Sequence, residues 1–375
     1  MTNILGLSAW AARRWQLSSI LLAAGMAALF ISNASQAATD CQSEKIISPS
    51  IQTAKNVREL LWQRKFAKLD RLAGQYSADL SSGEDGKSNL RAFFSGVSNS
   101  VANCGEKHSI DAQWETHRRL LEQWAKASPN SVAANLAGAS FLISYGWHAR
   151  GNGYASEVTD DGDRLFQQRV EQARARFEGM GQAERDNPEW YAGMLTVGLA
   201  QGWDKARFDA EFDEAIKKFP GYFPYYYTQA DFYSPKWYGS NEEFQKVVED
   251  AVRATPSLGE TMYARLQAHE WNDTMFRDGR ANWNRMAAGL IRINQDFPGI
   301  WNKNVYAHYA CLARDVGTLR VLLREIDGKV AYSTWGSREY YDSCREFANT
   351  RLCWQWADDH TTGCEPIENV PIKKF

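Results

Sequence analysis

The sequence lacks the short motifs by which many enzymes are identified. It contains no Gly-x-Ser-x-Gly nucleophile elbow and no Gly-x-x-x-x-Gly-Lys-Ser/Thr phosphate loop. Its 6 histidines include no pair spaced i, i+4, as a zinc site on a helix requires. We therefore predict no catalytic residue, no metal site and no cofactor, and a binding protein is favoured over an enzyme.

Two further absences narrow the class of protein. The formal net charge is −2, and no basic stripe of the kind that a nucleic-acid surface needs is present. After the first 31 residues, no apolar run approaches the length of a transmembrane helix. We expect neither nucleic-acid binding nor membrane insertion of the mature chain.

The N-terminus has the pattern of an export signal. Arg13 and Arg14 precede an apolar run over residues 17–31, which is short for a membrane span. Ser35-Gln36-Ala37 then fits a small-x-small cleavage site. We predict that residues 1–37 are a cleaved signal and that the protein is periplasmic or secreted. The alternative is an anchor formed by an uncleaved N-terminal helix.

The chain contains 6 cysteines, and an even number behind an export signal predicts a set of disulfides. One pair is expected near the start and two near the end, and the favoured bonds are Cys41–Cys104, Cys311–Cys344 and Cys353–Cys364. The sequence alone does not decide how the four C-terminal cysteines pair. The alternative is a zinc site that includes His360. Disulfides are favoured because structural zinc sites usually contain Cys-x-x-Cys spacings, which this chain lacks.

Nearly every segment after residue 50 has the apolar periodicity of a helix, and strand-like alternation is hardly visible. Capping residues, prolines and short polar breaks separate the segments. Helical pairs are expected at about 53–80, 87–101 with 112–127, 131–149 with 160–180, 188–201 with 204–218, 223–234 with 241–254, 258–271 with 280–296, and 302–326. After the signal we expect an N-terminal helical segment (38–109), a helical-repeat domain (110–327) and a cysteine-containing tail packed on the array (328–375).

One set of residues recurs at a fixed step of 36 residues. Four positions of a helix and its following turn, and one tyrosine, return in the next copy: Phe208, Phe212, Ala215, Pro220 and Tyr227, then Phe244, Val248, Ala251, Pro256 and Tyr263. A period in this range is typical of stacked helical hairpins. The predicted fold is all-α, with stacked antiparallel hairpins in a tetratricopeptide-like α-solenoid. Its repeats are irregular, because Phe208 and Phe244 stand where that repeat prefers a small residue.

The best candidate for a ligand site is a glycine-rich stretch at residues 147–163. Its side chains could hold an anionic or sugar-like ligand: Trp147, His148, Arg150, Asn152, Tyr154, Asp160 and Asp161. Helix ends also explain most of these residue types. Gly151 suits a left-handed helix C-terminus, and the aspartates suit a helix N-terminus. We weight the structural explanation above the functional one.

A second stretch is rich in aromatic residues, which can stack on sugars or anchor peptides. It comprises Tyr222, Phe223, Tyr225, Tyr226, Tyr227, Phe232, Tyr233, Trp237 and Tyr238. Most are expected in the core between hairpins, and the others on the concave face where repeat proteins bind. His269-Glu270-Trp271-Asn272-Asp273 is similar to the zinc-protease motif His-Glu-x-x-His, but Asp273 replaces the second histidine. We assign no metal to it.

The residues Trp147-His148-Ala149-Arg150-Gly151-Asn152-Gly153-Tyr154-Ala155 resemble a bacterial family known as domain of unknown function 4034. Residues 186–191, 201–203 and 235–240 add further matches, so the resemblance covers about residues 110–325. It implies a bacterial, tetratricopeptide-like helical protein and supplies no activity. We expect an exported scaffold that binds a protein or peptide in the cell envelope. The alternative is a ligand-binding protein or an enzyme with its site around the 147–163 stretch.

Overall fold

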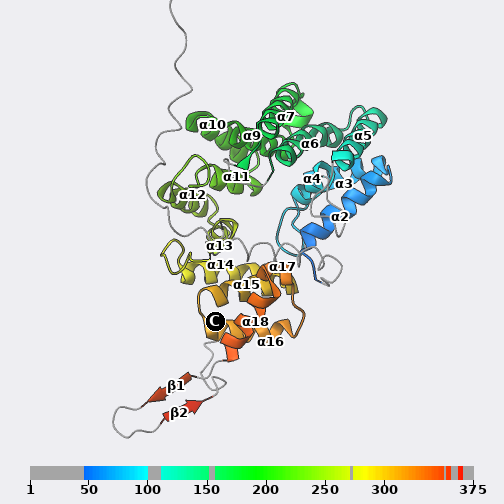
Figure 1. Cartoon of the computed structure of the whole chain (residues 1–375). Coiled ribbons are helices and arrows are strands. Elements are labelled where there is room, and N and C mark those ends of the chain that lie inside the picture. Colours follow the sequence, from blue (N-terminus) through cyan, green and yellow to red (C-terminus); the bar gives the residue numbers. More distant parts are fainter. Residues whose placement is uncertain are drawn as a thin grey trace, which may run out of the picture. The chain divides into compact units, whose positions relative to one another are not determined.

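The computed structural model describes residues 46–99, 111–151, 157–270 and 273–349, and the backbone of residues 352–355 and 362–365 (Figure 1). Several predictions lie outside the described residues: the signal at 1–37, the Cys41–Cys104 pair, and the candidate ligand residues Asn152 and Tyr154. The side chains of Cys353 and Cys364 are not described, so their bond stays a prediction.

The described chain folds almost entirely into α-helices, which confirms the predicted all-α class. The helices are α2 (Pro49–Trp62), α3 (Phe66–Asp79), α4 (Asn89–Ser98), α5 (Asp111–Ala127), α6 (Val132–Arg150), α7 (Asp160–Glu178), α8 (Gln182–Arg185), α9 (Pro188–Gln201), α10 (Lys205–Lys218), α11 (Pro224–Phe232), α12 (Asn241–Ala254), α13 (Glu260–His269), α14 (Trp283–Asp296), α15 (Ile300–Leu312), α16 (Val316–Ile326), α17 (Tyr332–Trp335) and α18 (Arg338–Asn349). None of these helices is long and apolar enough to cross a membrane.

The tail contains structure that the sequence analysis does not predict. Helices α17 and α18 follow the predicted array, and two short strands come after them. Strand β1 (Leu352–Gln355) pairs antiparallel with β2 (Thr362–Glu365), with Leu352 opposite Glu365. The predicted segment boundaries at residues 109 and 327 are not tested by this arrangement and stay predictions.

The residues that recur at a step of 36 lie in two hairpins of the same construction. Helix α12 begins and ends 36 residues after α10 (205 to 241 and 218 to 254). Asp204 and Ser240 cap the two helices, since the side chain of each accepts a hydrogen bond from a backbone N–H of the first turn. The echoed side chains on both helices are buried: Phe208, Phe212, Ala215, Phe244, Val248 and Ala251. Successive helices pack on one another along the chain, as in a solenoid, and regular repetition over the whole array stays a prediction.

The large residue at position 208 has a packing role that a small residue could not fill. The ring of Phe208 on α10 stacks on the ring of Phe232 on α11, with centroids 3.9 Å apart. Both side chains are fully buried. Such aromatic pairs add to the stabilisation that area burial alone provides. The departure from the tetratricopeptide pattern at this position therefore reflects an aromatic filling between the two helices of the hairpin.

The connection between α3 and α4, residues 81–88 (the 81–88 loop), is held by its own hydrogen bonds. Ser82 and Ser88 form an isolated antiparallel bridge, and Gly83 N donates to Lys87 O at 2.8 Å. The buried Asp85 carboxylate accepts hydrogen bonds from the Ser50 backbone N–H at 3.0 Å and from the Ser48 hydroxyl. The loop is therefore fixed to the start of α2.

The same loop contacts the C-terminal helices. The Asn302 side chain on α15 donates to Glu84 O at 3.3 Å, across 218 residues of sequence. Gly86 has φ +72, and a Cβ added to it would lie 2.7 Å from the ring of Phe297. Only glycine adopts this conformation readily and leaves room for the ring. Gly86 therefore allows the loop to approach the turn between α14 and α15.

A disulfide ties α15 to α18. Cys311 and Cys344 are bonded, as predicted, with their Cα atoms 5.8 Å apart and 33 residues between them in the sequence. Cys344 is buried among the apolar residues of α16, α17 and α18. The bond therefore fixes the last helix of the described array to the body.

We expect reduction of this bond, or the double change Cys311→Ser and Cys344→Ser, to lower the free energy of unfolding by about 3–4 kcal/mol, because closing a loop of this length restricts the unfolded chain by that amount. Urea unfolding of wild type and double variant, with and without a reductant, measures it. A variant as stable as the oxidised wild type would contradict the expectation.

Candidate functional site

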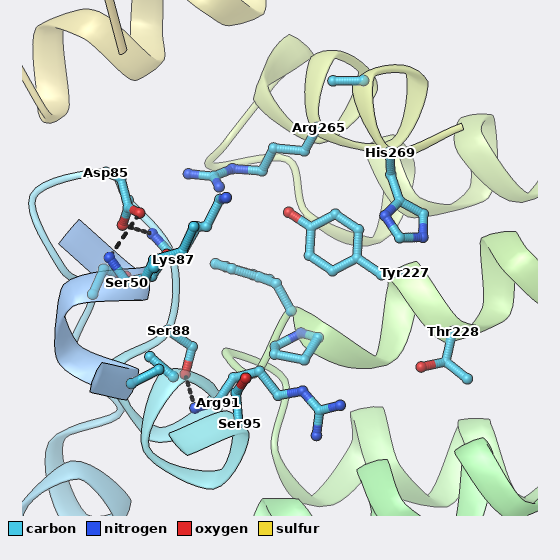
Figure 2. A pocket seen from close by; sticks show the side chains of 18 of the residues that line it. Ser50, Asp85, Lys87, Ser88, Arg91, Ser95, Tyr227, Thr228, Arg265 and His269 are labelled. Carbon is cyan, nitrogen blue, oxygen red and sulfur yellow. Dashed lines mark hydrogen bonds between the residues drawn. The ribbon is translucent and has the colours of Figure 1, made fainter. Parts of the chain in front are cut away.

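One hollow of the described structure is a cavity of about 1140 Å³ (the main cavity). Its wall is built from α2, the 81–88 loop, α4, α6, α9, α11, α13 and α15. Figure 2 shows the part where the 81–88 loop and α4 face α11 and α13. The volume exceeds the roughly 300–1,000 Å³ typical of sites for drug-sized ligands. The space can therefore hold a ligand larger than a single small molecule.

Cationic side chains outnumber acidic ones in the wall of the main cavity. Five permanent cations line it: Lys55, Arg58, Lys87, Arg91 and Arg265. The acidic residues in the lining are Asp85 and Asp231. Because charges in a cleft with low-dielectric walls reinforce one another, this excess attracts anions.

Both acidic groups of the lining already have partners. Burial favours a higher pKa for the Asp85 carboxyl, but hydrogen bonds from Ser48 and Ser50 outweigh burial, and the pKa lies below its ordinary value. Asp231 on α11 accepts from Nε2 of His269 on α13 at 2.9 Å. Both carboxylates keep their negative charge, and Asp85 attracts Lys87, so the lining carries five cations against two anions.

Arg91 lines the main cavity and also forms an ion pair with a buried carboxylate. Its Nη1 lies 2.9 Å from the carboxylate of Glu189, which is fully buried, whereas 48% of the Arg91 side chain is exposed. The hydroxyl of the buried Tyr222 also donates to Glu189. The carboxylate raises the pKa of Arg91 above its ordinary value, and burial raises the pKa of Tyr222. The two partners together satisfy a charge that would otherwise be costly inside the protein.

Arg58 and Lys55 on α2 differ in how firmly they are held. Arg58 donates from Nε to Asn99 O at 3.2 Å, and burial lowers its pKa. Lys55 is exposed at the cavity wall. His308 also faces the cavity, but burial lowers its pKa to about 4, so it is neutral at ordinary pH. The permanent positive charge of the site is therefore carried by lysine and arginine.

The rest of the wall alternates hydroxyl groups with apolar surface. Hydroxyls come from several helices, including Ser95, Ser140, Ser144, Thr196 and Thr228, and apolar surface comes from Ile51, Trp147, Phe223, Trp301 and Val305. Hydroxyls can donate and accept, so they suit a ligand with many polar backbone groups. Aromatic rings supply flat contact area.

Of the predicted ligand residues that the structure describes, only Trp147 lines the main cavity. Its ring packs on Phe166 with centroids 4.6 Å apart and meets Trp237 edge-on at 5.6 Å. His148 faces elsewhere: it stacks on Trp114 at 4.9 Å and bonds Asp111 at 3.0 Å.

Arg150 and the two aspartates lie around the start of α7. The Arg150 guanidinium sits over the Trp147 ring at 5.4 Å. Asp160 and Asp161 occupy the first turn of α7, and Asp161 pairs with Arg164 at 3.2 Å. A smaller hollow of about 500 Å³ is lined by Arg150 and Asp160 among others. The structure thus divides the predicted cluster, and helix-end roles account for its aspartates.

The aromatic stretch is mostly core, as predicted, while the predicted place of its other members on a concave binding face stays a prediction. Most members are buried core residues: Tyr222, Tyr225, Tyr226, Phe232 and Tyr233. Tyr222, Phe223 and Tyr227 also reach the wall of the main cavity. The stretch that is similar to the zinc-protease motif contributes His269, whose partner is Asp231, while Glu270 pairs with Lys236 at 2.9 Å. Among the described residues, no cluster of three or more potential metal ligands is found.

The cations of the main cavity are not among the site residues predicted from the sequence. One signal was available: Gly86-Lys87-Ser88 are the last three residues of the phosphate-loop motif, with Ser81 in place of its first glycine. Arg265 gives no such signal, because a single arginine on a helix usually lies in solvent. The remaining cations come from separate helices that only the fold brings together.

We expect Arg91→Ala to lower the free energy of unfolding by about 2–3 kcal/mol, because it leaves the buried Glu189 carboxylate without its cation. Adding Glu189→Gln should restore part of that loss. Arg253→Ala, which removes an exposed pair with Asp250, should cost less than about 0.5 kcal/mol. Urea unfolding of the single and double variants measures all three, and an Arg91→Ala protein as stable as wild type would contradict the structural assignment.

Comparisons with protein families, with curated proteins and with solved structures find no match to this chain. The resemblance to the domain of unknown function 4034 therefore stays a prediction.

Proposed function

We propose that this protein is an exported binding protein of the bacterial cell envelope whose main cavity takes acidic segments of a partner polypeptide. One observation carries the proposal: the wall of a cavity of about 1140 Å³ has five permanent cations, of which Arg91 is paired with Glu189, against two carboxylates in the lining. A ligand that brings carboxylates would complete the electrostatics of this space.

The size and lining of the main cavity favour a polypeptide over a small anion. A single small anion would leave most of the volume filled with water. An extended chain could place its backbone against the hydroxyls of α6 and α11 and its apolar side chains against Trp147, Phe223 and Trp301. Arrays of helical hairpins commonly bind partners along an inner surface of this kind.

The envelope location is supported by two features. The N-terminal 37 residues have the composition of an export signal. The Cys311–Cys344 disulfide is of a kind that forms and persists in oxidising compartments. An anchor formed by an uncleaved N-terminal helix remains the alternative within the same proposal.

An enzyme or small-ligand site around residues 147–163 is the less favoured function. The described polar residues of that stretch already bond to neighbours: His148 to Asp111, and Asp161 to Arg164. The smaller hollow beside Arg150 has half the volume of the main cavity or less, at about 500 Å³.

We expect a fluorescent hexaglutamate peptide to bind the purified protein, and matched hexaglutamine and hexalysine peptides to bind at least tenfold more weakly. Raising the salt concentration should weaken the binding, because screening shortens the range of the charges. Fluorescence anisotropy measures the three affinities.

A matched pair of tryptophan variants locates the binding. Ser144→Trp fills the main cavity from α6, and we expect it to weaken hexaglutamate binding at least tenfold. Ser343→Trp places the same side chain on the exposed face of α18, outside the cavity lining, and should leave binding unchanged. Equal binding of the acidic and neutral peptides, or equal effects of both variants, would refute the proposed function.

A further inference from the structure

Two cationic side chains of the main cavity converge on one space. Figure 2 shows the guanidinium of Arg265, from α13, and the ammonium of Lys87, from the 81–88 loop, extending toward each other. The Tyr227 hydroxyl, from α11, points toward the same region in this view. Like charges that approach each other raise the energy of the empty site unless an anion lies between them.

The position of Arg265 is fixed by its surroundings. A Cβ added at Gly86 would lie 2.8 Å from Nη2 of Arg265, so the guanidinium rests against the backbone beside Lys87. The absence of a side chain at Gly86 thus gives the guanidinium its place. This contact joins α13 to the 81–88 loop.

Neither cation has a carboxylate partner at ion-pair distance among the described residues, in contrast to Arg91. Nε of Arg265 is buried and makes no hydrogen bond. The nearest acidic group of the loop, Asp85, attracts Lys87 but gives its oxygens to Ser48, Ser50 and the Lys87 backbone N–H. Because Nε is buried, the groups that can reach an anion are the outer guanidinium nitrogens of Arg265 and the ammonium of Lys87 (Figure 2).

The backbone of the 81–88 loop does not act as a phosphate loop. In such a loop, backbone N–H groups cradle the phosphates. Here Gly83 N donates to Lys87 O, Gly86 N to Gly83 O and Asn89 N to Ser81 O. The side chain of Ser88 accepts from Arg91 N and caps α4. An anion at this place must therefore be held by side chains.

We propose that Lys87, Arg265 and Tyr227 form an oxyanion subsite that holds one carboxylate or phosphoryl group of the ligand. The inference rests on the proposed function and names the point at which the acidic chain is anchored. The planar fork of arginine binds two oxygens of such a group, lysine adds a point charge, and the tyrosine hydroxyl donates a further hydrogen bond. The bound group would bridge the 81–88 loop to α13.

The test uses hexaglutamate, a phosphoserine-containing hexapeptide and inorganic phosphate as probes, with Arg265→Gln and Lys87→Met as variants. Each variant should weaken hexaglutamate binding at least tenfold. Together they should weaken it by less than the product of their separate effects, because both contact one group. The controls Arg253→Gln and Lys246→Met remove exposed cations of α12 outside the cavity lining and should leave binding within twofold of wild type.

A melting curve of each ligand-free variant separates anion binding from a structural role. Since both substitutions remove a like-charge contact, the melting temperature should stay the same or rise; a fall in both variants would assign these residues to the fold and overturn the subsite. Tighter binding of the phosphopeptide than of hexaglutamate would identify phosphoryl as the occupant, and the reverse order would identify carboxylate.

The two proposals fail in different ways. If wild type binds hexaglutamate and both variants bind it equally well, the subsite is wrong and the proposed function stands. If wild type does not bind the peptides but binds inorganic phosphate in a manner lost in Arg265→Gln, the subsite stands and the peptide function is wrong. If no probe binds wild type, both are wrong.

Discussion

The approach of the 81–88 loop to the C-terminal helices is the constraint on which the main cavity depends. Gly86, in a left-handed conformation, admits the Phe297 ring and the Arg265 guanidinium where any side chain would clash. Asn302 fastens the same loop by donating to Glu84 O. Without this contact the early helices and α13–α15 would not share one wall. The cations that they contribute would then act as separate, solvated charges.

The electrostatics of the cavity follow from how its carboxylates are used. Glu189 is fully buried and neutralised by Arg91, while Asp85 and Asp231 are hydrogen-bonded within the wall. The pairing with Arg91 offsets the cost of burying the Glu189 charge, which would be large if the cation were removed. Lys87 and Arg265 are arranged differently, because their charges meet without an anion. A cavity whose cations outnumber its carboxylates is suited to an acidic ligand.

Local signals predict most of the fold and little of the site. Apolar periodicity and caps such as Asp204 and Ser240 depend on neighbours in sequence, and they place α9, α10 and α12 to within one residue. The four-residue helix α8 is not predicted. The site depends on contacts such as Glu84 with Asn302, which are 218 residues apart and leave no mark in a single sequence. The composition of the 147–163 stretch predicts a ligand site, but its described residues mostly serve helix ends. Gly86-Lys87-Ser88 was the one local signal, and its missing first glycine concealed it.

Whether an acidic chain binds between the 81–88 loop and α13 can be measured by hydrogen–deuterium exchange with and without saturating hexaglutamate, because exchange reports where the ligand binds without any substitution. The account predicts slower exchange in residues 82–91 and 260–269, the two elements that carry Lys87 and Arg265, and unchanged exchange in α16 and α18. Protection confined to residues 157–166, beside the smaller hollow, would contradict it. So would the absence of any protected segment.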